Sequence, residues 1–299
     1  MVPSFSLTYE AAVALTCLLT GILMIVCAAH HRLGWHTGLV MAGLSCVMCM
    51  LCARGYYLLV AGLGYSFELF PKAPYDYAFG GGVLGFLAAL WLTAVITRRK
   101  WAEIAEVFAP IGLLAIACLR LAEALSDFGW GDMLEVACLQ RYPFAIENMY
   151  GEWCAAVFNL EAACALGVLM VVLCRFNKGH RLLTGLCWWS VTQIFCESLR
   201  VESIVWGFVR VQQLQCALIL LVILLICTFR LPRKGRKRSL IPWILFLAGC
   251  GAVIFLEYAL DKLPWYSWIN YAAMAIVLAL MGLAVHSMIR ADVREKVCL

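Results

Sequence analysis

Residues 77–100 read YAFGGGVLGFLAALWLTAVITRRK, and this stretch decides the fold class. No charged side chain occurs between Gly80 and Ile96, and the basic run TRRK follows at once. A helix needs about 20 predominantly apolar residues to cross the hydrocarbon core of a bilayer. Lys and Arg concentrate beside the cytoplasmic ends of such helices. The stretch therefore predicts a transmembrane helix that ends at the cytoplasmic face.

The composition of the whole chain extends this interpretation. Of the 299 residues, 65% are hydrophobic and 14% are charged, whereas an ordinary soluble domain is about 45–50% apolar and about 25% charged. A mean hydropathy of +0.91 excludes a water-soluble globular domain, a coiled coil and a disordered chain. We predict an all-α polytopic membrane protein of about nine transmembrane helices. The apolar segments are 8–29, 37–63, 80–96, 103–125, 153–174, 182–199, 204–229, 239–260 and 270–289.

The 23 basic residues are divided unevenly between alternate loops. Most of them lie in the loops 30–36, 97–101, 175–181 and 230–238 and in the tail 290–296, whereas the intervening loops hold only Lys72, Arg141 and Lys262. The positive-inside rule then places the N-terminus outside and the C-terminus in the cytoplasm. The basic loop 230–238 is interpreted as an anchor against acidic lipid headgroups of the bilayer, and no nucleic-acid partner is expected.

The 16 cysteines lie mostly inside the apolar segments. Cys46, Cys49 and Cys52 share one helix face without a nearby histidine or acid, so they are expected to pack helices rather than to bind a metal. We expect no metal and no cofactor. Cys138 and Cys154 fall in or beside the longest outer loop, which is acidic, and a disulfide between them is left open.

Four arginines lie inside or at the edges of the predicted spans: Arg54, Arg120, Arg200 and Arg210. An arginine at a helix centre costs about 2.5–3.5 kcal/mol on insertion scales. The predicted orientation places all four in the outer half of the bilayer. Arg200 and Arg210, taken singly, can also reach the interface by snorkelling.

Acidic and polar residues accompany these arginines. Glu123 follows Arg120 by three residues, and Glu197 precedes Arg200 by three, a spacing that places two side chains on one helix face. Tyr9 and Glu161 add polarity to the first and fifth spans, and Gln212 adds polarity to the seventh span beside Arg210. We predict a shared polar cavity open to the outer leaflet. Because guanidinium forks suit phosphate oxygens, the expected ligand is an anionic phospholipid headgroup.

Seven short motifs resemble the prolipoprotein diacylglyceryl transferase family over about residues 8–229. In residues 77–100, GGGVLG is similar to the family's HGGLLG signature, with Gly80 at the histidine and Gly81 and Gly82 at the glycines. The other motifs follow in the family's order: LTYEAAV with Tyr9, CARGYY with Arg54, LRLAEALSDF with Arg120, FNLEA with Glu161, ESLRVE with Glu197 and Arg200, and VQQLQCALIL with Gln212. The chain departs from the family pattern at Gly80, at Glu123 in place of an asparagine, and at Asp127 or Phe128.

The resemblance implies transfer of a diacylglyceryl group from phosphatidylglycerol to the lipobox cysteine of a preprolipoprotein, in a bacterial plasma membrane. Arg120 and Arg200 are the expected phosphate clamp, with Tyr9, Glu123 or Glu197 as the proton acceptor. The expected substrate-binding residues are Arg54, Gly80, Gly81, Gly82, Glu161, Arg210 and Gln212. The alternatives are a non-catalytic membrane protein that binds phospholipid or lipoprotein, and a transporter of a small anion.

The resemblance also suggests a division of the chain. Residues 1–229 are expected to form the transferase-like membrane domain of seven spans, and 230–299 to add the basic loop and two extra spans. These two spans are expected to pack peripherally, with Glu257 at an outer end in reach of water or Lys262.

Overall fold

The structure is a computed structural model that describes residues 8–61, 77–126, 128–148, 150–175, 180–201, 203–206, 209–231, 239–263 and 266–297. Lys72, Asp127 and most of the basic loop 230–238 lie outside the described residues. The chain forms two compact units, Met1–Leu173 and Cys174–Leu299, and each is described by itself.

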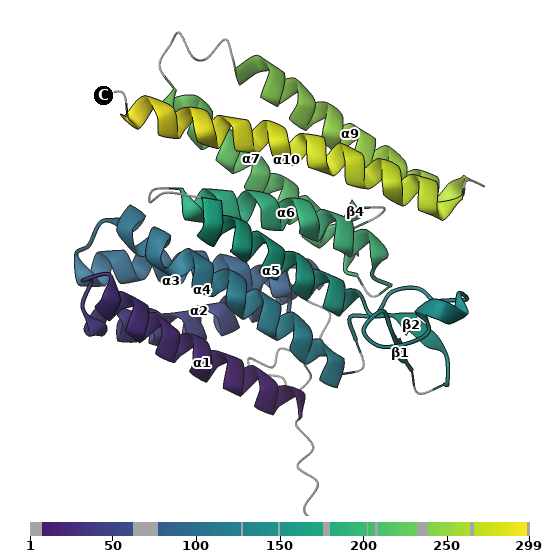
Figure 1. The fold of residues 1–299 in the computed structure, drawn as a ribbon, viewed down its shortest axis with the longest axis horizontal. Coiled ribbons are helices and arrows are strands. Elements are labelled where there is room, and N and C mark those ends of the chain that lie inside the picture. The colour runs from purple at the N-terminus through teal and green to yellow at the C-terminus, as the bar shows by residue number, and fades with distance from the viewer. Residues whose placement is uncertain are drawn as a thin grey trace, which may run out of the picture. The chain divides into compact units, whose positions relative to one another are not determined.

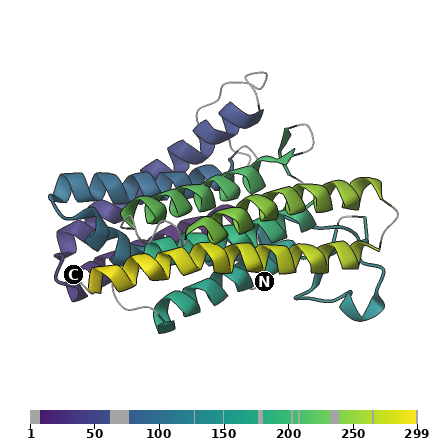
Figure 2. The ribbon, with the colours of Figure 1, turned by 90° about the horizontal axis from the view of Figure 1, so that it is seen from above.

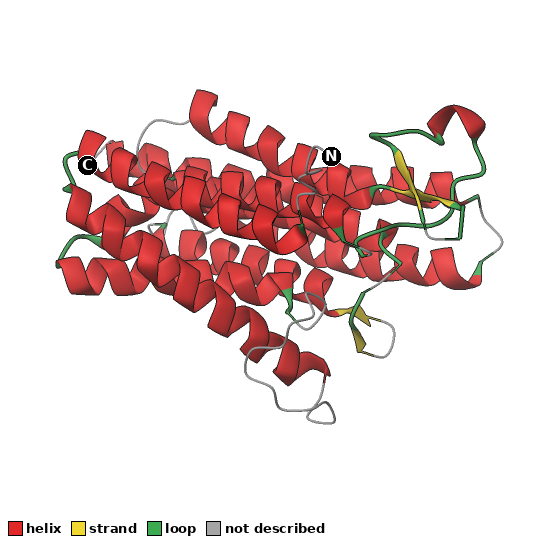
Figure 3. Cartoon of the chain, turned by 90° about the horizontal axis from the view of Figure 1, so that it is seen from below, coloured by secondary structure: helices red, strands yellow, loops and turns green. Residues whose placement is uncertain are grey.

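The first unit is built on five long helices (Figure 1). They are α1 (Tyr9–His30), α2 (Trp35–Ala61), α3 (Phe79–Thr97), α4 (Trp101–Ala122) and α5 (Val157–Arg175). The 3-10 turn η2 (Glu123–Leu125) continues α4, and the connection to α5 holds the 3-10 turn η3 (Ala137–Leu139) and the strands β1 (Ala145–Glu147) and β2 (Trp153–Ala155). The two strands pair antiparallel and are drawn in yellow in Figure 3. Residues 153–155 are therefore strand, where the hydropathy pattern predicted the start of a span.

Helix starts and stops follow local chemistry in this unit. The Thr8 hydroxyl accepts a hydrogen bond from the Ala11 amide at 3.3 Å and so caps the first turn of α1. At the end of α3, Arg98 adopts a left-handed conformation (φ 52°) that turns the chain directly towards α4. These two caps set helix boundaries that lie within a few residues of the apolar segments 8–29 and 80–96.

Glycines allow α2 and α3 to pack backbone to backbone. A Cβ atom at Gly81 would collide with the Cys52 carbonyl oxygen and the Ala53 Cα atom, and one at Gly85 would collide with the backbone at Met48 and Cys49. The four-residue spacing of these glycines is the small-residue pattern that lets membrane helices approach closely. The contact fixes the N-terminal end of α3 against α2.

The second unit contains α6 (Arg181–Leu199), α7 (Val211–Arg230), α9 (Leu240–Lys262) and α10 (Ser267–Val297). The short strands β3 (Val205–Trp206) and β4 (Val209–Arg210) form a hairpin before α7. The last two helices run side by side, as Figures 1 and 2 both show. Span seven therefore begins at Val211 rather than at 204, since the hairpin occupies the preceding residues.

Eight helices in the described part of the chain are long and apolar enough to cross a membrane. The other long helix, α6, is more polar because it carries Ser190, Gln193, Glu197 and Ser198, all of them buried. The predicted class, an all-α polytopic membrane protein, is confirmed. The segment 290–296, predicted as a tail after span nine, is helical and continues α10.

A buried charge cluster explains why α10 is longer than predicted. Asp292 Oδ2 lies 3.1 Å from His180 Nε2 at the start of α6 and 3.5 Å from Arg230 Nη1 at the end of α7. These contacts join three helices of the second unit at one set of helix ends. A paired, buried aspartate stabilises the helical conformation of the segment that carries it.

Candidate functional site

Arg120 forms the centre of a buried charge cluster in the first unit. Its side chain is 1% exposed, and its Nη1 atom lies 2.5 Å from Glu123 Oε1. Its Nε atom lies 3.0 Å from Glu161 Oε2 on α5, a charge contact rather than an aligned hydrogen bond. The guanidinium carbon lies 3.7 Å from the centre of the Phe79 ring at the start of α3. We call Tyr9, Phe79, Arg120, Glu123 and Glu161 the Arg120 cluster.

Two donor atoms of this arginine, Nε and Nη2, have no hydrogen-bond partner in the described residues, although Nε lies against the Glu161 carboxylate. The Nη2 atom of Arg120 is buried and pairs with no acceptor in the described residues. Leaving a buried donor of a charged group unsatisfied costs about 1–3 kcal/mol or more. Binding Glu123 and Glu161 alone gives the guanidinium no reason to leave its Nη2 group buried without an acceptor. The Nη2 group is therefore the position where a further acceptor fits.

Tyr9 reaches the same cluster from the first residue of α1. Its ring packs edge-on against Phe128, with 5.7 Å between ring centroids. Its hydroxyl lies close enough to Glu123 and Arg120 for a charge interaction with both. The i,i+3 pairing of Arg120 with Glu123 is confirmed, and the structure adds Glu161 and Tyr9 to that pair. Sequence reasoning missed Phe79, which no polar pattern marks.

Arg54 and the glycines lie where α2 meets the start of α3. The Arg54 side chain is buried, and its guanidinium carbon lies 5.5 Å from the Tyr57 ring centroid. The Ala78 amide donates to the Ala53 carbonyl at 3.1 Å, which fixes the glycine segment beside Arg54 in this unit. Gly80 is buried, Gly81 packs against α2, and a Cβ atom at Gly82 would meet no atom within 4 Å. Of the adjacent pair Gly81 and Gly82, Gly82 is thus the one with open space where a Cβ atom would lie.

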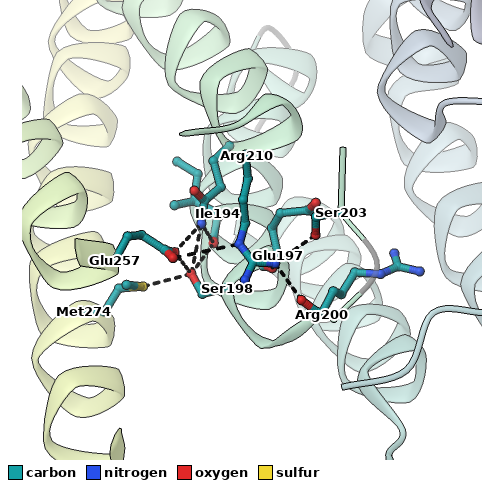
Figure 4. Close-up of polar contacts among 9 residues, drawn as sticks. Ile194, Glu197, Ser198, Arg200, Ser203, Arg210, Glu257 and Met274 are labelled. Carbon is teal, nitrogen blue, oxygen red and sulfur yellow. Dashed lines mark hydrogen bonds and ion pairs between the residues drawn. The ribbon is translucent and has the colours of Figure 1, made fainter. Parts of the chain in front are cut away.

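A second polar cluster lies at the C-terminal end of α6 in the second unit (Figure 4). Arg210 Nη1 lies within hydrogen-bonding distance of the Glu197 carbonyl at 2.8 Å, the Arg200 carbonyl at 2.5 Å and the Ser203 hydroxyl at 2.8 Å. The last carbonyls of a helix have no partner within it, and a nearby arginine can bind them. Arg210 therefore closes the end of α6. We call Glu197, Ser198, Arg200, Arg210, Gln213 and Glu257 the Arg210 cluster.

Gln213, rather than Gln212, joins this cluster. The Gln213 amide nitrogen lies 2.9 Å from the Ser198 hydroxyl and 2.6 Å from Glu257 Oε1. Gln212 is half-buried, and its amide nitrogen has no hydrogen-bond partner in the part of the chain that is described. The predicted role of Gln212 in substrate binding is not tested by these contacts. The glutamines at 212, 213 and 215 lie too close together in the sequence for their spacing to show that Gln213 and Gln215 are the buried ones.

Glu257 contacts polar residues that the sequence did not connect with it. It lies on α9, and its carboxylate accepts hydrogen bonds from Gln213 and Ser198 and lies 3.8 Å from Arg210 Nε. The sequence placed Glu257 in reach of water or Lys262; its side chain is 17% exposed, and its hydrogen-bond donors lie on α6 and α7. A carboxylate in an apolar helix gains more from two hydrogen-bond donors and a cation than from partial exposure.

The two clusters assign the predicted residues to separate units. Tyr9, Arg120, Glu123 and Glu161 meet in the first unit, whereas Glu197, Arg200 and Arg210 lie together in the second. Arg200 follows the last helical residue of α6 in an extended conformation (φ −81°, ψ 138°), so the helical spacing from Glu197 does not apply to it. The shared cavity for all four arginines stays a prediction.

The described residues form neither a metal-binding cluster nor a disulfide between Cys138 and Cys154. No group of three or more His, Cys, Asp or Glu side chains there could hold a metal ion. Cys138 and Cys154 are both free thiols, the first exposed and the second buried. Burial, followed by the charge of Glu152, raises the pKa of the Cys154 thiol. The disulfide that the sequence left open is not formed in this structure.

Comparisons with known proteins point to one family. The family model described as prolipoprotein diacylglyceryl transferase matches residues 2–229. The phosphatidylglycerol–prolipoprotein diacylglyceryl transferase of Bacillus cytotoxicus is 25% identical over 209 residues, which cover 64% of this chain and 76% of that protein. The protein of the same name from Bacillus velezensis is 26% identical over 203 residues (63% and 75%), and that from Clostridium kluyveri is 25% identical over 205 residues (65% and 79%). The family match ends at the end of α7, so α9 and α10 lie beyond it.

Proposed function

This chain belongs to the prolipoprotein diacylglyceryl transferase family, and we propose that its Arg120 cluster binds the phosphate of the phospholipid substrate. The function is transfer of a diacylglyceryl group from phosphatidylglycerol to a prolipoprotein in lipoprotein biosynthesis. In this reaction the lipobox cysteine thiolate attacks the glycerol carbon beside the phosphate ester. A carbon–sulfur bond forms, the carbon–oxygen bond breaks, and glycerol phosphate leaves with the electron pair.

The buried, unpaired Nη2 group of Arg120 carries the proposal. A departing phosphate gains negative charge in the transition state, and a fixed cation in a site without water stabilises that charge. The guanidinium is held on one side by Glu123, on a second by Glu161 and across its face by Phe79. It therefore needs no reorientation when the phosphate oxygen arrives, which is the condition for efficient electrostatic catalysis.

Two carboxylates beside one arginine supply the proton acceptor. A cysteine thiol with an ordinary pKa of about 8.5 must lose its proton to become the nucleophile. We propose that Glu123 takes it. Its carboxylate lies beside Arg120, so a thiol that approaches the bound phosphate would come close to it. The proton moves from the thiol to Glu123 as the carbon–sulfur bond forms. Tyr9 and Glu197 remain the other candidate acceptors.

Further residues have proposed roles. Arg54 would extend the positive field, and Gly82, with open space beside it, would let a headgroup approach the backbone. Arg200 is the second proposed phosphate contact. We further propose that residues 1–229 are the transferase domain of a multi-pass protein of the bacterial plasma membrane, with the N-terminus outside, because the basic loops alternate along the chain. Reporter fusions that place 230–238 outside the cell would contradict this orientation.

The test of the function uses the purified chain in phosphatidylglycerol bilayers with a lipobox peptide. Transfer adds a diacylglyceryl mass to the peptide thiol. Arg120→Ala should reduce the rate by about 30-fold or more, since truncating one member of a buried charge pair typically costs about 2–5 kcal/mol. Arg141→Ala removes an exposed arginine from the outer connection and is the matched control.

Each outcome has a distinct meaning. Transfer by the parent chain and the Arg141 variant, with little by the Arg120 variant, supports the proposal. Full transfer by Arg120→Ala would show that the phosphate binds elsewhere. No transfer by a folded parent chain that still binds phosphatidylglycerol would favour a non-catalytic lipid-binding protein, a result that glycine in place of the family's histidine at Gly80 would explain.

A further inference from the structure

Glu257 brings a negative charge from α9 into the Arg210 cluster (Figure 4). Its Oε1 atom accepts hydrogen bonds from Gln213 Nε2 at 2.6 Å and from the Ser198 hydroxyl. Its Oε2 atom lies 3.8 Å from Arg210 Nε. The Glu257 side chain is 17% exposed, so solvent screens this charge only partly. Three helices, α6, α7 and α9, thus meet at one carboxylate.

Arg210 connects Glu257 to the C-terminal end of α6. Its Nε atom faces Glu257, whereas its Nη1 atom binds the carbonyl oxygens of Glu197 and Arg200. A planar guanidinium fixes these two sets of contacts in one orientation. The backbone at Arg200 is therefore held at the point where the chain leaves the helix. The direction of the Arg200 side chain follows from that backbone, and Figure 4 shows its guanidinium pointing away from Glu257.

We propose that Glu257 is a positioning residue for the transfer reaction, acting through Arg210 to fix the backbone that carries Arg200. The inference rests on the proposed function, in which Arg200 contacts the phosphate. The family match ends at residue 229, so the restraint comes from a helix beyond the matched segment. The last two helices are thereby connected to the reaction, as well as to the packing of the second unit.

Removing the charge of Glu257 without changing its shape distinguishes this positioning role from simple packing of α9. A glutamine at this position has the same shape, and its carbonyl oxygen can accept the bonds from Gln213 and Ser198. Only the attraction to Arg210 would be lost. If α9 served only to cover α6 and α7, Glu257→Gln should be nearly silent. If the charge holds Arg210, the same change should loosen the end of α6.

The experiment measures transfer and local stability in the full chain. Glu257→Gln, Glu257→Asp, Arg210→Gln and the double variant of Glu257→Gln with Arg210→Gln are assayed in phosphatidylglycerol bilayers with the lipobox peptide. Hydrogen exchange of the amides at the end of α6 is followed by mass spectrometry. Glu257→Gln should lower kcat/KM by about tenfold and speed that exchange, Glu257→Asp should retain part of the activity, and the double variant should lose no more than Arg210→Gln alone.

Asp292→Asn is the matched control. It neutralises a buried aspartate of the same unit that pairs with His180 and Arg230, at the opposite ends of α6 and α7 from Glu257. It should lower the melting temperature while transfer and exchange at the end of α6 stay unchanged. Equal loss of transfer in Asp292→Asn would mean that the effect of Glu257 is general destabilisation, and the proposal would be overturned.

The remaining outcomes also test the proposed role of Glu257. Full transfer and unchanged exchange in Glu257→Gln would overturn the proposal. Additive losses in the double variant would show that Glu257 does not act through Arg210. No transfer by the parent chain would refute the proposed function, and the exchange data alone would then show whether Glu257 holds the end of α6.

Discussion

Two adjacent glycines of α3 should respond in opposite directions to the same substitution. In Gly81→Ala the new Cβ atom would meet the Cys52 carbonyl oxygen and the Ala53 Cα atom far inside normal contact distance. Both are backbone atoms of α2, so the helices must separate. In Gly82→Ala the new Cβ atom has no atom within 4 Å. The pair therefore isolates the helix contact from the intrinsic helix preference of alanine.

The magnitude follows from two opposing contributions. Overpacking against a backbone that cannot move aside costs about 1–3 kcal/mol. Alanine is favoured over glycine within a helix by roughly 0.5–1 kcal/mol. Gly81→Ala should thus lose about 1–2 kcal/mol of unfolding free energy, and Gly82→Ala should gain up to about 1 kcal/mol. The two variants should differ by several degrees in melting temperature.

Thermal unfolding in lipid nanodiscs, followed by tryptophan fluorescence, measures the difference. Gly81→Ala should also lower transfer, because the Ala78–Ala53 hydrogen bond beside Arg54 lies at the same contact. Equal melting temperatures for the two variants would show that α2 and α3 do not pack as closely as described. A stable Gly82→Ala variant that has lost transfer would support the proposed approach of the headgroup to that backbone.

Three further predictions concern single positions. Arg120→Lys should recover little transfer relative to Arg120→Ala, because an ammonium cannot hold two carboxylates and a phosphate in one plane. Transfer by Arg120→Lys above half that of the parent chain would contradict the proposed phosphate contact. Gln213→Ala should destabilise the second unit more than Gln212→Ala in the same unfolding assay, since only Gln213 has described partners; equal effects would contradict its role in the Arg210 cluster. The raised pKa of Cys154 keeps its thiol neutral to higher pH, so maleimide should label it more slowly than exposed Cys138 at pH 8. The difference in labelling rate should narrow as pH rises. Faster labelling of Cys154 than of Cys138 in peptide mapping by mass would contradict this prediction.

Helix count and class were predictable because they depend on local composition. Apolar segments of about 20 residues are recognised one at a time, and the bilayer makes each of them a helix. The boundary errors have local causes too. Residues 153–155 and 204–210 are apolar enough to extend a span, but Trp153–Ala155 pair as a strand with Ala145–Glu147, and Val205–Trp206 pair with Val209–Arg210. Hydropathy alone cannot separate a short apolar strand from the first turn of a helix.

The site was predictable only where partners are close in sequence. Arg120 and Glu123 follow from their spacing on one helix, and the pair is confirmed. Glu161 and Glu257 meet their partners from other helices, and the sequence gives only the depth of each in its own span. For Glu257 the sequence indicated the helix end and access to water but not the donors on α6 and α7. Hydrogen-bond donors on a neighbouring helix are the stronger alternative in an apolar environment.

Arg120 and Arg210 illustrate how contacts separate a reacting arginine from a structural one. The Nη1 atom of Arg210 faces two carbonyls at a helix end and a hydroxyl, a set of acceptors that the fold itself must satisfy. Arg120 faces two acids and an aromatic ring, and its Nη2 group is buried without an acceptor among the described residues. An apolar side chain of similar size would be at least as stable in a purely structural position. The unsatisfied donor is thus better explained by a ligand than by folding, and loss of Arg120 should reduce transfer more than stability, whereas loss of Arg210 should reduce both.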